Sequence, residues 1–383
     1  MRRYFDWAAT ALPWEPYGLY DGRPNGRLFF GNPSSPHAEG RKAKEALEEA
    51  RSRCALVLGV QPETLYFTSG ATESNTLVLH SFLKRKEKGK LLYSAVEHPS
   101  IRENCRALEH LNLPIASIAV EKDGRVSLQT LEKALEKNPD ARFAAIMTVN
   151  NETGALMDMK ALSALIRQKQ KGPHIHLHSD LVQAAGKFPL DIKGWDLDSA
   201  SISAHKLGGP GGIGLLYLPK PLDVLSAGKQ ERGIRAGTEN ILGALALARI
   251  LEERASRDFT KNEALKAEER MGFLIKALKA MKRCRLIPED RQERDRRFSP
   301  WILQARFAGI PGEPMLRALD NEGFAISTGS ACASASQERP VLAAMGLGKT
   351  EQLEGIRISQ GWTTTMDDIE ALLKGIEKVL EFL

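Results

Sequence analysis

The sequence predicts an α/β fold, because short apolar runs alternate with helical patterns between about residues 60 and 220. Such alternation is typical of a mostly parallel sheet that is flanked by helices. A second observation is that polar and glycine-rich clusters directly follow several of the apolar runs. A third is the change after residue 238, where helical patterns dominate to about residue 281 and shorter elements follow. We therefore expect a large sheet domain, a boundary near residue 250 and a smaller C-terminal domain.

The expected strands are short runs of aliphatic, aromatic and β-branched residues. In chain order they cover residues 65–68, 91–94, 144–149, 176–178, 200–203, 215–218 and 355–359. The run at 144–149 is the most apolar, as expected of a parallel strand that is buried on both faces. Helical patterns at 132–137 and 159–169 lie between strands. The last helix should begin at Thr365, with Asp368 as its capping-box partner.

The composition is that of a globular protein, with 383 residues, 42% of them hydrophobic and 27% charged. The net charge of +6 is small for a chain of this length, so we expect no nucleic-acid partner. A mixed-sign run from Arg291 to Arg297 predicts a solvated loop. The chain has no run of about 18 uncharged apolar residues, and its first residues lack the apolar core of a secretory signal. These features predict no membrane partner and a cytoplasmic location.

Four cysteines are present, and their spacing does not match a zinc-binding pattern. Cys54 and Cys105 continue apolar series with helical spacing, and Cys284 lies beside an apolar segment, so we expect three structural thiols. Cys332 is different, because its neighbours are small residues and no periodic apolar face accounts for it. Alternating histidines at 174, 176 and 178 share a strand face, but no arrangement of further ligands supports a metal site, and none is expected.

The most informative cluster follows a strand that ends at Ser203, His205 and Lys206 and then breaks into glycine. An earlier strand ends near Asp180, and Gln183 follows three residues later. Pyridoxal phosphate requires a lysine that can form a Schiff base, an aspartate that holds a proton on a pyridine nitrogen, and small polar donors for a phosphate. Gln183 could bind the hydroxyl oxygen of the same ring. The sequence therefore predicts a pyridoxal phosphate site.

Two glycine-rich segments have competing interpretations. Residues 209–214 match the dinucleotide motif G-x-G-x-x-G, but they precede an apolar strand and not a helix, so we reject that assignment. At 67–75 a strand end and a glycine turn lead into a helix. The first N–H groups of this helix and the Thr72 hydroxyl could bind an anion. The alternative is simple capping of the helix by Ser69 or Thr72.

Further polar residues follow strands or lie in polar loops. His98 could stack on a cofactor ring and move protons. Asn151 could bind a ring hydroxyl or a substrate carboxylate, and a turn role is the alternative. Arg235 and Thr238 could serve an anion. Arg357 could hold a carboxylate with two parallel hydrogen bonds, and a surface arginine on an edge strand is the alternative.

Ten blocks of the chain, in the same order, resemble the cysteine desulfurases of the class V aminotransferase family. They are 6–10, 31–37, 69–75, 97–99, 150–154, 180–183, 203–206, 232–238, 327–336 and Arg357. The resemblance implies the pyridoxal-phosphate-dependent transferase fold type I, with a large cofactor-binding domain at 15–250. Residues 1–14 and 251–383 would form a smaller α+β domain that carries the loop of Cys332. Trp7, the segment 12–30 and Trp362, which stands where the family usually has arginine, depart from the pattern.

The resemblance also implies a chemical role for individual residues. Lys206 would form the Schiff base, Asp180 would pair with the pyridine nitrogen and Gln183 with the ring hydroxyl. His98 would stack on the ring and serve in acid–base steps. Cys332 would be the nucleophile that accepts sulfur.

Other matching residues would bind the cofactor phosphate or the substrate. The implied phosphate ligands are Ala71, Thr72, Ser203 and His205, joined by Thr238 from the second subunit of a homodimer. Asn151, which would also contact the cofactor, and Arg357 would hold the substrate carboxylate.

The implied reaction converts L-cysteine to L-alanine and leaves a persulfide on Cys332. The segment 327–334 resembles the longer-loop group of the family, which delivers sulfur to iron–sulfur scaffold proteins. One alternative is another enzyme of the same family, such as a selenocysteine lyase, a C–S lyase or an aminotransferase. A second alternative is a non-catalytic scaffold with this fold.

Overall fold

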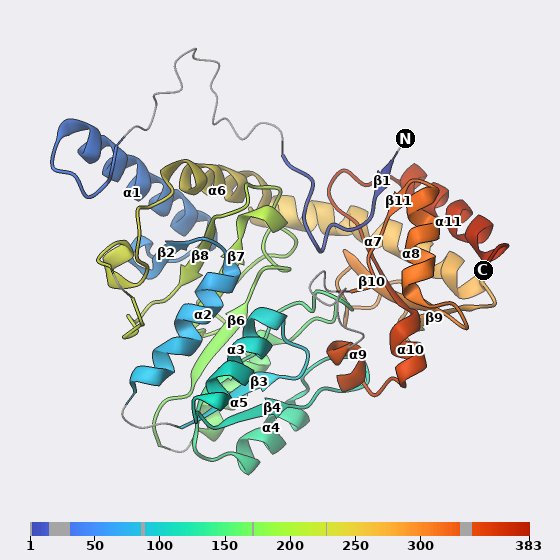
Figure 1. Ribbon diagram of the computed structural model, residues 1–383, viewed down its shortest axis with the longest axis horizontal. Coiled ribbons are helices and arrows are strands. Elements are labelled where there is room, and N and C mark those ends of the chain that lie inside the picture. Colours follow the sequence, from blue (N-terminus) through green and yellow to red (C-terminus); the bar gives the residue numbers. More distant parts are fainter. Residues whose placement is uncertain (1, 15–30, 86–88, 171, 227, 330–338) are drawn as a thin grey trace.

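The computed structural model describes residues 2–14, 31–85, 89–170, 172–226, 228–329 and 339–383. At its centre lies a seven-stranded sheet in the order β2-β8-β7-β6-β5-β3-β4 (Figure 1). The strands are β2 (Leu65–Thr68), β3 (Lys90–Ser94), β4 (Ile115–Ile118), β5 (Ala141–Ala145), β6 (His176–Asp180), β7 (Ser199–Ser203) and β8 (Gly214–Tyr217). Neighbours from β7 to β4 pair in parallel, whereas β8 pairs antiparallel with both β7 and β2. The expected mostly parallel sheet is confirmed.

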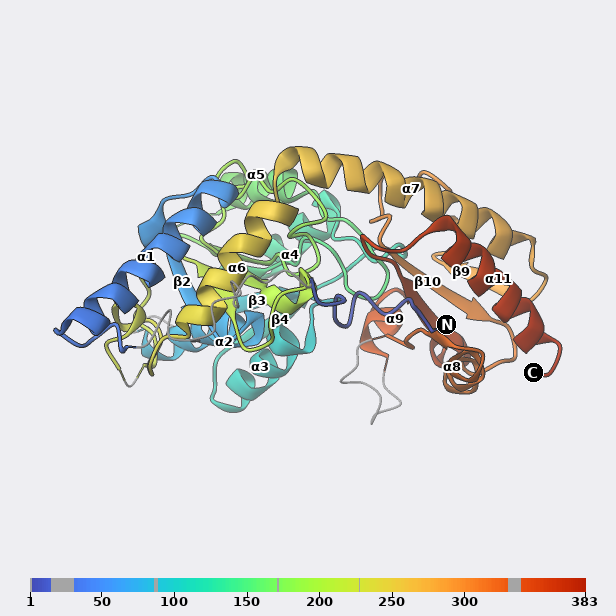
Figure 2. The same cartoon turned by 90° about the horizontal axis from the view of Figure 1, so that it is seen from above.

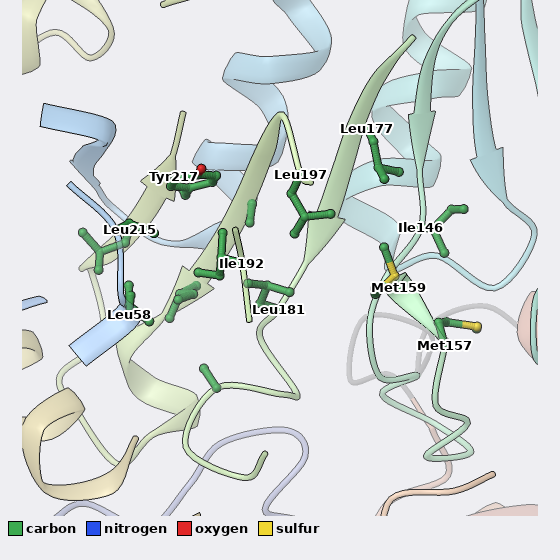
Figure 3. Packing of buried hydrophobic residues seen from close by; sticks show 14 of the residues in the cluster. Leu58, Ile146, Met157, Met159, Leu177, Leu181, Ile192, Leu197, Leu215 and Tyr217 are labelled. Carbon is green, nitrogen blue, oxygen red and sulfur yellow. The ribbon is translucent and has the colours of Figure 1, made fainter. Parts of the chain in front are cut away.

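Helices cover both faces of this sheet, because side chains along each buried strand alternate between two cores. In β3, for example, Leu92 belongs to the larger core and Leu91 to the smaller one. Figure 3 shows the larger core around Leu177 and Leu181. Helices that contribute to it are α1 (Ala38–Leu58), α4 (Leu128–Lys137), α5 (Met159–Lys169) and α6 (Ile241–Arg254). The smaller core receives α2 (Ala71–Ser81) and α3 (Pro99–His110).

A second, antiparallel sheet with the order β12-β10-β9 lies beside the first (Figure 2). Its strands are β9 (Cys284–Ile287), β10 (Ile302–Phe307) and β12 (Gly355–Ser359). This sheet has its own core with α7 (Arg257–Ala280), α8 (Gly312–Asn321) and α11 (Met366–Leu380). Two short helices, α9 (Pro340–Ala344) and α10 (Lys349–Glu354), precede β12 in the chain. The N-terminal strand β1 (Arg3–Tyr4) pairs with β11 (Phe324–Ala325), so the start of the chain joins the C-terminal elements (Figure 1).

Several local expectations are confirmed. Helix α5 has the expected bounds, and α11 begins after Thr365, which forms a capping box with Asp368. Cys54, Cys105 and Cys284 are buried. No helix in the described part of the chain combines the length and the apolar character that a membrane span requires.

The expected strand at 144–149 is wrong in its bounds, because β5 begins at Ala141 and ends at Ala145. Beyond that point the chain stays buried, and Ile146 and Thr148 still donate their N–H groups to the carbonyl oxygens of His178 and Asp180 in β6. Met147, which faces the other way, donates its N–H to Glu97 Oε1 at 2.6 Å. The apolar run therefore covers the end of β5 and a segment that keeps hydrogen bonds to β6 on one side only.

The expected solvated loop at 291–297 is wrong for Arg291, which is 1% exposed. Its guanidinium donates to the carbonyl oxygens of Thr153 at 3.0 Å and Ser299 at 2.9 Å, and it lies over the ring of Phe298. Burial lowers the pKa of Arg291 to about 9. This arginine therefore ties the turn after β5 to the segment before β10.

Candidate active site

A cavity of about 480 Å³ lies where loops follow the carboxyl ends of β6 and β7, the usual place for a ligand in an open α/β sheet. All the predicted site residues that the structure describes line this cavity, except Arg235 and Thr238. Those that line it are Ala71, Thr72, His98, Asn151, Asp180, Gln183, Ser203, His205, Lys206 and Arg357. Residues more than 280 positions apart in the sequence therefore meet around one space.

Lys206 lies in a 3-10 turn, Ala204–Lys206, directly after β7. Its Nζ donates to the carbonyl oxygens of Ala8 at 2.5 Å and Ala9 at 2.7 Å. The N-terminal segment thus lies against the cavity and holds the amine with neutral acceptors.

Asp180 ends β6, and its carboxylate is held from two sides. Oδ1 accepts the backbone N–H of Val182 at 2.9 Å, and Oδ2 accepts from Asn75 Nδ2 at 3.2 Å. The Oδ1 of Asn75 in turn accepts from His178 Nε2 at 2.9 Å and from Ser201 Oγ at 2.6 Å. All of these side chains are buried, so the orientation of Asp180 is fixed before any ligand binds.

His98 caps the N-terminus of α3. Its Nδ1 accepts the backbone N–H of Ser100 at 3.1 Å, so the proton of the neutral ring lies on Nε2. Burial lowers the pKa of His98. A neutral imidazole with an Nε2–H donor therefore lines the cavity at neutral pH.

The anion site predicted at 67–75 is supported over simple capping. Helix α2 follows Gly70, whose φ is 152°, and no side chain caps its first N–H groups. Ser203 and His205 line the cavity beside them. Burial, together with Lys206 and His98, lowers the pKa of His205 to about 4, so this imidazole is neutral. Uncapped N–H groups and neutral donors are what a phosphate group needs.

Glycine is required where β8 passes this turn. A Cβ on Gly214 would lie 2.7 Å from the Cα of Gly70. This close approach explains one glycine of the rejected dinucleotide motif, and Gly211 and Gly212 of the same motif line the cavity.

Arg357 lies in the middle of β12 and is 1% exposed, so the alternative of a surface arginine is wrong. Nη1 donates to the carbonyl oxygen of Asn151 at 2.8 Å, and Nη2 donates to Asp6 Oδ1 at 2.8 Å. The side-chain Oδ1 of Asn151 is buried, and no hydrogen-bond partner for it occurs among the described residues. Such an orphaned acceptor in a cavity indicates a place for a ligand donor.

Arg235 and Thr238, which could serve an anion, do not line the cavity. Thr238 is exposed, and its carbonyl oxygen accepts from Arg235 Nη1 at 3.2 Å. Cys332 and its neighbours from 330 to 338 lie outside the described residues.

The alternating histidines have partners other than a metal. His174 pairs with Asp198 at 2.6 Å, and the rings of His176 and His178 both contact Ser199 Oγ. Over the described ranges, no group of three His, Cys, Asp or Glu residues could hold a metal ion.

The sequence reasoning missed Asn75 and Lys187. Asn75 lies within a block that carried the family resemblance, so a signal for it was present. Lys187 gave no signal, because a lysine eight residues before a tryptophan in a mixed segment is ordinary surface composition. In the structure Lys187 is 2% exposed and donates to Gln183 Oε1 at 2.8 Å.

The donor set fits pyridoxal phosphate. It combines an amine at a strand end, a buried carboxylate, a neutral imidazole and an uncapped helix N-terminus around one cavity. This fold and this site define a pyridoxal-phosphate-dependent enzyme of the aminotransferase type.

Comparisons with known proteins agree. The profile of the aminotransferase class-V family matches residues 3–372. The chain is 35% identical to the cysteine desulfurase IscS of Dictyoglomus turgidum, over 99% of this chain and 95% of that protein. It is 34% identical to a mitochondrial cysteine desulfurase of Arthroderma benhamiae, over 99% of this chain and 75% of that protein.

Solved structures give the same result. A NifS-like protein matches with a TM-score of 0.88 at 30% identity, and a NifS-like protein from Rickettsia africae matches with 0.83 at 29%, each over 100% of both chains. The chain belongs to the class-V aminotransferase family, within its cysteine desulfurase group.

Proposed function

We propose that this chain is a pyridoxal-phosphate-dependent cysteine desulfurase that converts L-cysteine to L-alanine and carries the sulfur as a persulfide. The observation that carries this proposal is the meeting of Lys206, Asp180 and Arg357 around one cavity in a chain of the cysteine desulfurase group. An amine, an acid partner and a carboxylate anchor are what an amino-acid substrate requires of such a site.

The position of each cavity residue supports a separate role in this reaction. When bound, the cofactor supplies an electron-withdrawing ring that weakens the bonds at the substrate α-carbon. We propose that Asp180 keeps the ring nitrogen protonated and that Ala71, Thr72, Ser203 and His205 hold the phosphate. Arg357 and Asn151 would hold the substrate carboxylate. Lys206 would bond to the cofactor and then move the α-proton, with His98 Nε2 as the second proton carrier.

Cys332 would take the sulfur. Its thiolate attacks the substrate sulfur, the new S–S bond forms as the C–S bond breaks, and the carbon keeps the electron pair and gains a proton. The products are alanine and a persulfide on Cys332. Burial raises the pKa values of Cys54, Cys105 and Cys284 to about 12, so these three thiols cannot replace it at neutral pH.

The test is an assay of sulfide and alanine formation from L-cysteine with a thiol reductant. The Cys332→Ala variant should lose sulfide release by at least about 100-fold and still show the shift of the visible absorption band on addition of cysteine. Cys284→Ala, which removes a buried thiol, is the matched control and should remain active. Full activity of Cys332→Ala would instead indicate a lyase or an aminotransferase, and a colourless wild type would indicate the scaffold alternative.

We further propose that the chain is divided into a large domain at 15–250 and a small domain made of 1–14 and 251–383. We also propose a homodimer, in which Thr238 of one subunit contributes to the phosphate site of the other. The exposure of Thr238 outside the cavity is compatible with such a contribution. Sedimentation analysis of the purified protein tests the dimer. The acceptor is proposed to be an iron–sulfur scaffold protein, and the cytoplasmic location stays a prediction.

A further inference from the structure

Lys187 is a buried amine at the edge of the candidate active site. It lies in the turn that follows β6, four residues after Gln183, and is 2% exposed. Its Nζ donates to Gln183 Oε1 at 2.8 Å. Within the described residues no carboxylate lies within ion-pair distance of this amine. A buried ammonium without a countercharge destabilises a fold, so stability alone does not explain its presence.

The contact fixes the orientation of the Gln183 amide. Lys187 Nζ is the donor of this bond, so the amide oxygen of Gln183 faces Lys187. The amide nitrogen must then face the other way, where Nε2 donates to the carbonyl oxygen of Ala8 at 2.8 Å. The same carbonyl oxygen accepts from Lys206 Nζ. The amide nitrogen has a second hydrogen, which can serve a ligand in the cavity that Gln183 lines.

We propose that Lys187 is a positioning residue, which holds the Gln183 amide so that it presents an N–H, and not a carbonyl oxygen, to the ring hydroxyl oxygen of the bound cofactor. This inference rests on the proposed function. Without the lysine, the amide can rotate by half a turn and place its oxygen toward the ring oxygen, where two acceptors repel each other. Lys187 itself touches no substrate in this scheme and acts through Gln183.

The electrostatics of the site without cofactor agree with a role of Lys187 in positioning and not in stability. Burial, with smaller contributions from Lys206 and Arg357, lowers the pKa of Lys187 to about 7. Replacing the amine by an apolar side chain of similar length should therefore stabilise the protein without cofactor, or leave its stability unchanged. A residue kept for structure would have the opposite effect.

The experiment measures the affinity of the apoenzyme for pyridoxal phosphate, by titration of the visible band, and the melting temperature of the apoenzyme. Lys187→Met should weaken cofactor binding about tenfold, which corresponds to about 1.4 kcal/mol, without lowering the melting temperature. Lys187→Gln keeps an N–H donor and should restore binding to within about threefold of the wild type. Lys193→Met, on an exposed lysine, is the matched control and should change neither quantity.

A double-mutant cycle with Gln183→Met decides whether Lys187 acts through the glutamine. In the Gln183→Met background, Lys187→Met should add less than about a twofold further loss of affinity. A further tenfold loss in that background, unchanged binding by Lys187→Met alone, or a lowered apoenzyme melting temperature would each overturn the proposal. A wild type that binds no pyridoxal phosphate would overturn the proposed function instead, so the two failures are distinguishable.

Discussion

The Arg357 guanidinium is fixed in one orientation by its hydrogen bonds in this site. The guanidinium is buried, and its two terminal nitrogens are fixed by a backbone oxygen and by the Asp6 carboxylate. Nε is buried and has no hydrogen-bond partner within the described residues. A planar fork that is fixed in this way has little entropy left to lose when it binds a carboxylate.

Replacing this fork by a point charge should weaken the binding of substrate. Arg357→Lys is expected to raise the KM for L-cysteine about tenfold or more, with a smaller effect on kcat, because the contact is made in the ground state and in the transition state. Steady-state kinetics measure both quantities. Arg306→Lys, on an arginine of β10 that pairs with Glu354, is the control. An unchanged KM for Arg357→Lys would contradict the proposed carboxylate anchor.

At the residue scale, the sequence could indicate groups with characteristic chemistry but not groups that act through others. Lys206 and Asp180 were predictable, because each lies at or just after the end of a strand and has the side chain that the cofactor requires. Lys187 was not predictable, because neither its burial nor its bond to Gln183 follows from a pattern in the neighbouring sequence.

At the element scale, the N-terminus of α2 is the feature on which anion binding depends. A helix of 11 residues begins here without a side-chain cap. It follows Gly70, whose φ of 152° is rarely adopted by residues other than glycine. An uncapped end that faces a cavity leaves its N–H groups for a ligand.

Loss of the Thr72 hydroxyl should therefore weaken the binding of the cofactor and not the stability of the fold. We expect Thr72→Val to lower the affinity for pyridoxal phosphate about 10- to 100-fold, the value of one hydrogen bond to a charged group. Titration of the apoenzyme measures this. Thr76→Val, one turn further along α2 and away from the cavity, should leave the affinity unchanged. Equal affinities for the two variants would argue against a phosphate at this helix end.

Element types could be predicted from the sequence better than element limits. The pattern at 159–169 gave the bounds of α5, because its cap and its apolar face agree. The bounds at 144–149 failed, because residues 146–148 keep hydrogen bonds to β6, whereas the Met147 N–H on the other side is bound by the Glu97 side chain. A contact with a residue about 50 positions away leaves no local trace in the sequence.

At the scale of the whole molecule, the N-terminal segment connects the two sheets. Trp7 packs edge-on against Trp362, with ring centroids 5.7 Å apart, and the Arg254 guanidinium lies 4.2 Å from the Trp362 ring centroid. A Cβ on Gly361 would lie 2.0 Å from the Trp7 ring, so glycine is required between them. Trp7 and Trp362 are both positions at which a departure from the family pattern is expected from the sequence, and the structure shows that the two side chains form one contact.

The buried histidines should make the fold sensitive to acid. Burial lowers the pKa values of His176 and His178 to about 3, whereas an unfolded histidine titrates near about 6.5. Between these values the unfolded chain binds more protons, so the free energy of unfolding falls as the pH falls, by up to about 1.4 kcal/mol per pH unit for each histidine. Urea unfolding between pH 7 and about pH 5 measures this slope.

His176→Gln should flatten the slope, since one of the two buried bases is gone. His110→Gln removes an exposed histidine at the end of α3 and should keep the slope of the wild type. The account of the buried histidines fails if the two variants show the same pH dependence.

The most direct test of the central claim is to trap the cofactor on the protein with borohydride and to locate the modified peptide by mass spectrometry. The predicted result is one reduced adduct on Lys206. An adduct on Lys187, the other amine beside the cavity, on a surface lysine or on no residue would contradict the assignment of the active site.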